Sequence, residues 1–477
     1  MDQLRKVTGK SKEDTEINEL ILVEAKSNKE QLIKILSEGF FYNGRHYVRF
    51  GKSASQGKEG ITLFIDEKYY DEMFRRSQLD IEVNECVISK YESQRNLILS
   101  TCTLIEDEPL PHICVVGEYT KIIPNQLVRF VKEENHIRTI AEDYKDIKIS
   151  PFDGCGCHTR KMSETWSRYF DIDYTAVGFQ VRLPFLKGYS VEMPIKEYYE
   201  SIGVKEITDI FGRKHKVDEI DCLWNVTMWK AYEIFKNKYG NDGFKEYINV
   251  LNKYEYCLGI SKYSHHVNHI NIKTRMNFQY LQCLDLWNPK YINRKNILDI
   301  SNWGKMLCLA GYTTRLYERI IKGDKFYSYK FLGFTDSDNF LVNSKFMEAI
   351  LINDSMLNDP AIKSFIYRKL KKCIEQAKYG KIYADGFYHT CVGDMIGYLE
   401  YCAGMEPVGY LKAKEFYCDT TIPKKSILSF RSPLVCPSEV NYVSIVEGNT
   451  WLQQFKNQDI VMINMYDLSM PQQGGIK

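Results

Sequence analysis

Arginine and lysine side chains beside strands and turns are the residues of this sequence whose types and placement best suit chemistry. Such cations bind anionic groups, and arginine can bind phosphate through two hydrogen bonds where lysine acts as a point charge. One of them alone at a strand end is usually a solvated side chain. Four stretches carry them here: VRFGKSASQGKEGITLFI (48–65), SPFDGCGCHTRK (150–161), GFQVRLPFLKGYSVEMP (178–194) and LSFRSPLVCPSEVNYVSIVEG (428–448).

Other catalytic and metal-binding templates are missing from the sequence or fit it poorly. There is no G-x-S-x-G, no H-E-x-x-H and no Walker loop. Cys155, Cys157 and His158 stand too close together to complete a tetrahedral metal site alone. We interpret the remaining clusters as surface or structural histidines and as solvated turns: His265, His266 and His269; Asp171 with Asp173; Asp336 with Asp338.

Length and composition describe a globular chain with several domains. The chain has 477 residues, of which 44% are hydrophobic and 26% charged, so two or three domains with substantial cores are expected. No apolar run is long enough for a transmembrane helix, and the polar N-terminus does not resemble a signal peptide, so we expect a cytoplasmic protein without membrane contact. The 14 cysteines form no CxxC pair and are expected to be reduced. The net charge of +2 neither supports nor excludes nucleic-acid binding.

The hydrophobic patterns change period twice along the chain. Residues 1–45 are predicted to be mainly helical, with a capping box at 27–30. Strands are predicted at 46–50, 60–65, 96–105, 112–119, 176–183 and 188–193. Helices are predicted at 225–240, 243–254, 274–287, 302–321 and 359–380, the last with Asp359 as N-cap and Gly380 as terminator. After residue 381 the pattern is again typical of strands.

Two of these regions resemble a known family. The chain resembles the two-barrel RNA polymerases, namely the RNA-silencing RNA-dependent RNA polymerases and their single-chain relatives in phages and prophages. DGCG followed by FQVRLPFLKG is similar to the family's first double-psi β-barrel, where an Asp-Gly-x-Gly turn precedes a hairpin bearing Arg and Lys. The entry into the family's second barrel is similar to KIYADGFYHTCVGDMIGYLEYCAG followed by FRSPLVCPSEV. A Ser/Gln-rich stretch of the phage-type members resembles SASQGKEG. The similarity covers residues 45–475 in the family's order.

The resemblance implies an α+β fold with two double-psi β-barrel-like units, the second incomplete, that meet face to face. A helical insertion should separate the units and wrap around them, and an N-terminal α/β region should precede them. The implied boundaries are 1–95 for the N-terminal region, 96–224 for the first unit, 225–375 for the insertion and 376–477 for the second unit.

The resemblance also implies roles for individual residues in RNA synthesis from nucleoside triphosphates on a nucleic-acid template. Lys187 and Arg182 would neutralise phosphates, and Arg431 would contact the ribose or phosphate of the incoming nucleotide. Lys187 and Arg431 are the catalytic candidates, and these three cations should line one cleft. Further nucleic-acid contacts at its rim would come from Arg160 and Lys161, with His158 nearby. The implied structural turns use Asp153, Gly154, Gly156, Gly188, Gly474 and Gly475.

The metal site implied by the resemblance is not found in the sequence. The family holds Mg²⁺ on an Asp-x-Asp-Gly-Asp loop, and QDIVMINMYDLSMPQQGG (458–475) resembles the approach to it, but the chain ends after Ile476 and Lys477. Asp459 and Asp467 lie in or beside a strand and do not replace the loop. We therefore expect a chain cut short before its Mg²⁺ ligands.

Three interpretations of this ending stay open at the level of sequence. The chain is a polymerase fragment, one half of a split polymerase whose second chain supplies the acidic loop, or a nucleic-acid-binding remnant without catalysis. In each case we expect little RNA synthesis by these residues alone. The sequence does not distinguish an RNA template from a DNA template.

Overall fold

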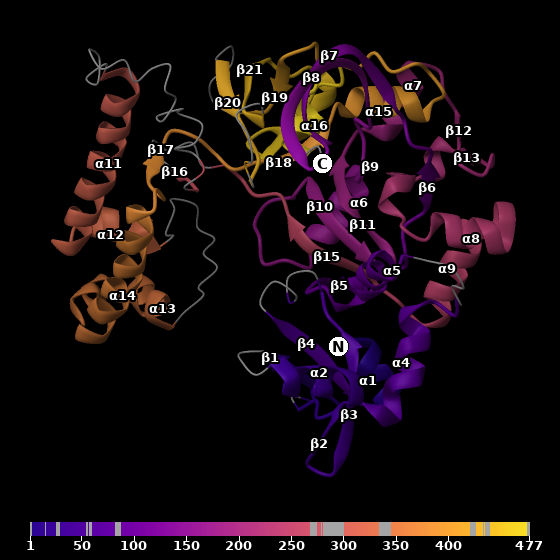
Figure 1. The fold of residues 1–477 in the computed structure, drawn as a ribbon, viewed down its shortest axis with the longest axis horizontal. Coiled ribbons are helices and arrows are strands. Elements are labelled where there is room, and N and C mark those ends of the chain that lie inside the picture. Colours follow the sequence, from indigo (N-terminus) through magenta and orange to yellow (C-terminus); the bar gives the residue numbers. More distant parts are fainter. Residues whose placement is uncertain are drawn as a thin grey trace.

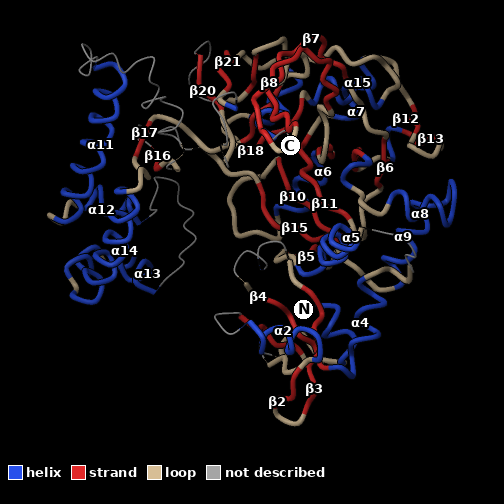
Figure 2. Tube along the Cα trace, viewed as in Figure 1, coloured by secondary structure: helices blue, strands red, loops and turns tan. Residues whose placement is uncertain are grey.

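The computed structural model describes most of the chain in four parts: an N-terminal lobe, two β units and a helical lobe (Figure 1). The secondary structure of each part is shown in Figure 2. No helix in the described part of the chain is both long and apolar enough to cross a membrane. The described residues are 2–14, 16–24, 29–53, 56, 60–81, 87–267, 274–277, 279, 300–332, 345–419, 426–432, 434 and 439–474.

The N-terminal lobe is a small sheet with helices, in the order β1-β4-β3-β2. The sequence predicts that residues 1–45 are mainly helical, and this prediction is wrong at Leu20–Glu24 and Phe40–Tyr42, which form the strands β1 and β2. The four consecutive apolar residues at the start of β1 lie in a strand that pairs with β4. The predicted capping box at 27–30 lies largely outside the described residues. The elements are α1 (Asp2–Thr8), β1 (Leu20–Glu24), α2 (Lys29–Glu38), β2 (Phe40–Tyr42), β3 (Arg45–Gly51), β4 (Ile61–Asp66) and α4 (Tyr70–Ser77).

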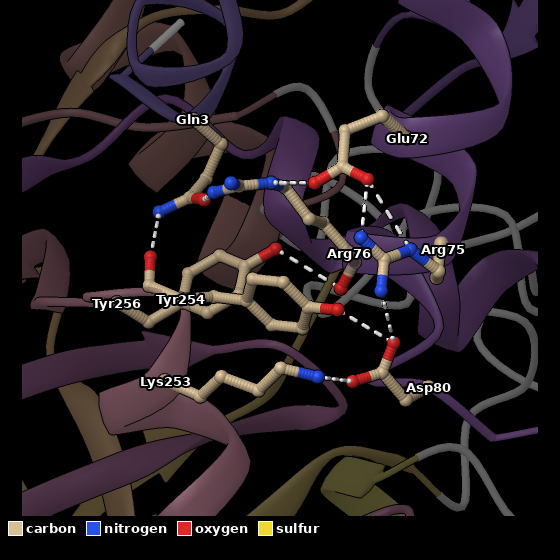
Figure 3. Close-up of polar contacts among 8 residues, drawn as sticks. All are labelled: Gln3, Glu72, Arg75, Arg76, Asp80, Lys253, Tyr254 and Tyr256. Atoms are coloured by element: carbon tan, nitrogen blue, oxygen red, sulfur yellow. Dashed lines mark hydrogen bonds and ion pairs between the residues drawn. The ribbon is translucent and has the colours of Figure 1, made fainter.

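A network of polar contacts joins this lobe to the rest of the molecule (Figure 3). Asp80 accepts hydrogen bonds from Lys253 and from the Tyr254 hydroxyl, each at 2.5 Å. The Gln3 side chain donates to the Tyr254 carbonyl at 3.1 Å, and the Arg76 guanidinium lies over the Tyr254 ring. Residues far apart in the sequence thus hold the lobe against the helix that ends at Lys253.

The first β unit is built on a seven-stranded sheet in the order β5-β15-β10-β11-β9-β14-β6. β9 runs parallel to β11, and β14 parallel to β6, while the other pairs are antiparallel. The predicted strand 96–105 is a 3-10 turn at Asn96–Leu99 followed by β5. The strands are β5 (Thr103–Ile105), β6 (Ile113–Val116), β9 (Cys155–His158), β10 (Gly178–Leu183), β11 (Leu186–Glu192), β14 (Cys222–Asn225) and β15 (Leu258–Tyr263).

The first β unit extends beyond residue 224, where its predicted boundary lies. β15 is the second strand in the sheet order and pairs with both β5 and β10. The apolar faces of α8 and α9 also pack on this unit, because Phe235, Tyr247 and Leu251 belong to the same core as Trp224. The helices of the unit are α5 (Ile88–Arg95), α6 (Arg160–Ser167), α7 (Ile195–Ser201), α8 (Tyr232–Tyr239) and α9 (Gly243–Lys253).

Two small β elements accompany this sheet. A long ribbon of β7 (Lys121–Glu134) and β8 (Ile137–Ile149) leaves it after β6 and arches over the second β unit (Figure 1). At its base, the Lys121 ammonium lies 3.6 Å from the centre of the Tyr466 ring. A short hairpin of β12 (Glu206–Thr208) and β13 (Lys214–Lys216) follows α7.

The helical lobe stands beside the two β units and does not wrap around them (Figure 1). Its helices pack mainly on one another, around two small cores that include Tyr317 with Leu370 and Leu332 with Ile350. The predicted helix 359–380 is confirmed: Asp359 accepts hydrogen bonds from the first backbone N–H groups, and Gly380 has a positive φ. The elements are α11 (Ile300–Ile321), α12 (Lys325–Leu332), α13 (Lys345–Ile352) and α14 (Pro360–Lys378).

A two-stranded bridge connects the helical lobe to the second β unit. It pairs β16 (Thr274–Arg275) with β17 (Tyr383–Ala384). The predicted helix 274–287 is therefore wrong at its first two residues, and residues 280–287 lie outside the described part of the chain.

The second β unit has a five-stranded sheet in the order β18-β22-β19-β21-β20. The strand-like interpretation of the sequence after 381 is wrong for Met395–Cys402, which forms α15, capped by Asp394. This helix is buried almost all around, so its sequence lacks the polar face that indicates a helix. The other elements are β18 (Thr390–Gly393), β19 (Glu415–Tyr417), β20 (Ser426–Ser429), β21 (Asn441–Ile445), β22 (Ile460–Ile463) and α16 (Ser469–Gly474).

The two β units share one hydrophobic core, as expected for barrels that meet face to face. That core includes Cys157 and Leu223 from the first unit and Leu399 and Met462 from the second. The Tyr199 hydroxyl donates to the Leu399 carbonyl across the junction at 2.9 Å. The arrangement is two curled β units joined through a common interior.

Candidate functional site

The β10–β11 hairpin places Arg182 directly opposite Lys187. Their Cα atoms are register partners, so both side chains leave the sheet on the same face. Alternation explains the hairpin, because Phe179, Val181 and Leu183 point into the core from the other face. The sequence prediction that these two cations lie together is therefore consistent with their register.

Two further segments are hydrogen-bonded to this hairpin. The Gly154 N–H donates to the Thr227 hydroxyl at 2.7 Å, and the Gly154 carbonyl accepts from the Tyr189 N–H at 2.9 Å. The Lys230 N–H donates to the Phe185 carbonyl at the hairpin turn, at 2.7 Å. The Asp153–Gly154 turn, the hairpin and the turn 227–230 thus form one rigid assembly.

Glycine is required at two points of this assembly. A Cβ on Gly188 would lie 2.4 Å from Met228 Cε and 2.8 Å from the Gly154 carbonyl oxygen. A Cβ on Gly156 would lie 2.7 Å from the Leu223 carbonyl oxygen. Both contacts are closer than a side chain tolerates, so Gly188 allows the hairpin to approach the two turns, and Gly156 allows β9 to approach β14.

Lys230 is a member of the site that the sequence analysis missed. Its side chain is half-buried, and its Nζ donates to the Thr227 carbonyl. Burial lowers the pKa of Lys230, the charges of Lys187 and Lys90 lower it further, and Asp153 acts in the opposite direction. Lys187 and Lys90 are thus close enough for their charges to act on Lys230, and we call Lys90, Lys187 and Lys230 the lysine cluster. Lys230 follows the 3-10 turn Val226–Met228, and nothing else about its position in the sequence marks it as a site residue.

Arg182 lies deeper than Lys187. Lys187 is exposed, whereas Arg182 is half-buried, donates to the carbonyl of its neighbour Val181 at 2.8 Å, and lies near Cys102. Burial lowers the pKa of Arg182, although a guanidinium stays charged at neutral pH.

The positive charges of the lysine cluster and Arg182 are not matched by close carboxylates. Among the described residues, none of these four side chains forms an ion pair with an N···O distance of 4.0 Å or less. The carboxylates whose charge Lys230 senses, Asp153 and Glu118, are both exposed and lie beyond that distance. Within the described part of the chain, the site therefore presents cations that are not held in ion pairs, which suits an anionic ligand.

The other predicted contacts of the first unit lie at a different place. β9 runs parallel to β11 with Cys155 opposite Tyr189 and His158 opposite Glu192, so residues after His158 are at the far end from Lys187. Arg160 pairs there with Glu164 and Glu192, and Lys161 pairs with Asp221 at 3.4 Å. The structure does not bring Arg160 and Lys161 to the lysine cluster.

His158 is part of the core. It is fully buried, and its ring nitrogens lie 2.8 Å and 2.9 Å from the hydroxyl oxygens of Ser190 and Ser163. Burial lowers the pKa of His158 to about 3, so the imidazole is neutral at physiological pH. Cys155 and Cys157 are buried free thiols beside it.

Arg431 is exposed and lies in the segment that follows β20 of the second unit. Burial raises the pKa of the Cys391 thiol on β18 to about 11, and the positive charge of Arg431 counteracts part of that rise. Cys391 is in turn near enough to Cys155 to influence its titration. Arg431 is therefore near β18, whose Cys391 in turn acts on Cys155 of β9. Gly474 ends α16, and Gly475 lies outside the described residues.

The carboxylates and histidines considered in the sequence do not assemble a metal site where the structure describes them. The described residues contain no group of three or more His, Cys, Asp or Glu side chains that could hold a metal ion. Asp459 accepts a hydrogen bond from the His265 N–H. The Asp467 carboxylate accepts hydrogen bonds from the Lys414 and Ser469 N–H groups. The His266 ring stacks on the Tyr174 ring. Asp336, Asp338 and His269 lie outside the described residues. Within the described ranges, these side chains do not fit a two-metal site.

Comparisons with known proteins give two informative matches. No protein-family model matches the chain. The DNA-directed RNA polymerase YonO of Bacillus phage SPbeta is 24% identical over 419 residues, which cover 85% of this chain and 44% of the phage protein. The solved structure of the RNA-dependent RNA polymerase QDE-1 from Thielavia terrestris matches with a TM-score of 0.52 at 13% identity, over 93% of this chain and 46% of that one.

The fold and the sequence similarity agree with the resemblance that the motifs indicate. The chain shares its fold with a two-barrel RNA polymerase and is similar in sequence to a phage RNA polymerase. The match to QDE-1 shows the shared fold, and the match to YonO adds the relationship in sequence. The chain spans less than half of the length of either relative.

Proposed function

We propose that the chain forms part of an RNA polymerase and that its first β unit binds the phosphates of a nucleoside triphosphate. The observation that supports this function best is that the lysine cluster and Arg182 form no ion pair with a described carboxylate, in contrast to Arg160 and Lys161, which pair with carboxylates of their own chain. The similarity to two RNA polymerases supports the same reaction class.

The residues of the site would act by positioning and by charge. In nucleotidyl transfer the protein mainly holds the phosphates in line and stabilises negative charge as it develops. Lys230 sits on a rigid turn in a partly dry environment, where its charge acts more strongly than in water. A bound triphosphate would raise the pKa of Lys230, because an opposite charge favours the ammonium form. Arg431 would approach the same ligand from the second unit.

We further propose that residues 1–477 do not carry out the transfer step alone. The family's divalent metal ions would supply charge stabilisation at the reacting phosphate. The sequence contains no Asp-x-Asp-Gly-Asp, so the carboxylates for these ions would have to come from outside these residues. The chain would then depend on a further polypeptide segment or on a partner chain for RNA synthesis.

A binding experiment tests the first proposal. Residues 1–477 are titrated with a fluorescent ATP analogue and with single-stranded RNA at several salt concentrations. Replacing Lys187 or Lys230 with Glu should weaken binding about tenfold or more and reduce the slope of log affinity against log salt by about 0.7, the value for one phosphate contact on a single strand. The matched control is Lys161→Glu, which changes an exposed lysine of the same unit and should leave both quantities nearly unchanged. Equal effects at positions 187 and 161 would contradict a specific site.

A synthesis assay tests the second proposal. With Mg²⁺, template and nucleoside triphosphates, residues 1–477 should extend RNA at a negligible rate. Supplying a segment that carries Asp-x-Asp-Gly-Asp, fused or as a separate chain together with the rest of the barrel, should restore metal binding. Robust template-directed synthesis by residues 1–477 would show that other carboxylates of the chain form the metal site.

A second function remains consistent with the same cluster: binding of nucleic acid without catalysis. The site's cations bind phosphate whether it belongs to a triphosphate or to an RNA backbone. The two functions differ in the ligand that competes. Displacement of the ATP analogue by free triphosphate would favour the polymerase function, and displacement by RNA alone would favour the binding function.

A further inference from the structure

The ribbon of β7 and β8 carries large apolar side chains on a face that is open to solvent. Because side chains alternate along a strand, the ribbon has two faces. On one of them, which we call the outer face, Leu127 lies opposite Tyr144 and Val131 lies opposite Ile140. These four residues are between 50% and 78% exposed. The opposite face is better covered, and its half-buried residues include Val128, Phe130 and Ala141.

Two ion pairs alternate with the apolar pairs along the outer face. Arg129 lies opposite Glu142 and pairs with it, between the two apolar pairs. Glu133 lies opposite Arg138 beyond Val131, and their charged groups are 2.8 Å apart. The outer face therefore has four cross-strand rows in the order apolar, charged, apolar, charged. The sign of the charge changes from one charged row to the next on each strand.

The composition of these rows favours a protein partner. A contiguous apolar surface that is exposed on a folded protein commonly marks an interaction site. Exposed ion pairs contribute little to the stability of a single ribbon, so the charged rows are better explained by selection of a partner. The two cations and the two carboxylates of the rows cancel, whereas a surface for nucleic acid carries excess positive charge.

The pattern of the rows is complementary to itself. Consider a twofold axis that runs along the ribbon between two outer faces, so that each row lies against the same row of a second copy and β7 lies against β8. Arg129 then meets Glu142 of the second copy, and Glu133 meets Arg138 of the second copy. The apolar rows meet apolar rows in the same arrangement. All four rows are matched, which is the requirement for an interface between identical chains.

We propose that the outer face of the β7–β8 ribbon binds a second copy of this chain, with the two ribbons packed face to face. Aligned packing of two sheets is a common geometry, with strand directions within about 30° of each other. The face is only two strands wide, so the interface falls at the low end of specific interfaces, about 1,200 Å² in total. We therefore expect a weak dimer, with a dissociation constant on the order of 10 μM. The lysine cluster takes no part in this contact.

The first test is sedimentation velocity of residues 1–477 at concentrations on either side of the expected dissociation constant, from about 1 to 100 μM. The wild type should shift from monomer to dimer across this range. Ile140→Lys should remain monomeric, because it places a charge in the middle of the apolar rows. The matched control is Ile137→Lys, which changes the same residue type on the same strand, 67% exposed but on the opposite face. This control should dimerise like the wild type.

A second test uses two variants with opposite charges on the outer face. Arg129→Glu combined with Arg138→Glu leaves only negative charges in the rows, and Glu133→Arg combined with Glu142→Arg leaves only positive charges. Each variant alone should be monomeric, and an equimolar mixture should associate at least as tightly as the wild type. Both should bind the ATP analogue like the wild type, which shows that they are folded.

Three results would overturn the proposal. The first is a wild-type chain that stays monomeric at the highest concentration. The second is an equal effect of lysine at positions 140 and 137, because the outer face would then have no special role. The third is a mixture of the two charge variants that does not associate under conditions in which the wild type dimerises.

Discussion

Substitution of Gly188 by alanine should disrupt the lysine-cluster site through a steric effect alone. The added Cβ would lie 2.4 Å and 2.5 Å from the Cε and Cγ atoms of Met228, and 2.8 Å from the Gly154 carbonyl oxygen. Met228 is fully buried, so its side chain has little room to move away. The carbonyl belongs to the Asp153–Gly154 turn, which can move only by breaking its hydrogen bonds to Thr227 and Tyr189.

The magnitude follows from the size of the overlap. Insertion of one methyl group into a packed interior costs about 1–3 kcal/mol, and here one of the contacts is with backbone. We therefore expect the free energy of unfolding of Gly188→Ala to fall by about 2 kcal/mol. The triphosphate affinity should fall as well, because the turn that holds Lys230 moves relative to Lys187.

The assay combines urea unfolding with titration of the fluorescent ATP analogue. The control is Gly311→Ala on α11, where the nearest atom to the new Cβ is the flexible end of Arg315 at 3.4 Å. That variant should be neutral or more stable by up to about 1 kcal/mol, because alanine favours a helix. If Gly188→Ala unfolds at the same urea concentration as the wild type and binds the analogue equally well, the close approach does not hold the site together.

Three further predictions concern the stability of the surrounding structure. The pKa of His158 is lowered to about 3, so the unfolded state binds more protons between pH 3 and 6.5, and stability is lost as the pH falls through that window. The destabilisation caused by His158→Gln, measured by urea unfolding, should therefore shrink by about 1.4 kcal/mol per pH unit below 6.5. A destabilisation that stays constant with pH would show that the histidine is charged in the folded protein. Asp80→Asn should weaken the contacts to Lys253 and Tyr254 in Figure 3 and speed proteolysis of the N-terminal lobe. The affinity of the lysine-cluster site for the ATP analogue should stay the same. Proteolysis at the wild-type rate would mean that apolar contacts hold the lobe. Asp359→Ala should destabilise the helical lobe by about 1 kcal/mol through loss of its N-cap, seen as faster amide exchange in α14, and exchange at the wild-type rate would contradict this.

The elements that the sequence predicted well are those with a single exposed face or clear end signals. The β10 strand of the hairpin around Lys187 alternates apolar and polar residues, and this alternation defines the strand and the face on which Arg182 lies. α14 has Asp359 before it, Pro360 in its first turn and Gly380 after it, and the structure has the same bounds within two residues. Local chemistry was sufficient in both cases.

The elements that the sequence did not predict depend on the environment of the folded chain. α15 is buried on nearly every side, so its residues show no helical alternation of polar and apolar character. The β7–β8 ribbon is largely exposed on both faces and turns at Asn135 and His136, both with positive φ but without the glycine that usually marks such a turn. Lys230 joins the site only because a hydrogen bond places it beside the turn at Phe185, which no spacing rule indicates.

The common core of the two β units has a consequence for the order of events during synthesis on the ribosome. Leu223 of the first unit is buried against residues that begin with Val392 of the second, about 170 residues later in the chain. At about 5–20 residues per second, translation of that interval takes on the order of 10–30 s. During that time the apolar side of the first unit has no partner, and nascent chains on neighbouring ribosomes present the same surface to one another. The helical lobe, made in the interval, thus sets the length of a delay in which chaperones would have their main opportunity to act.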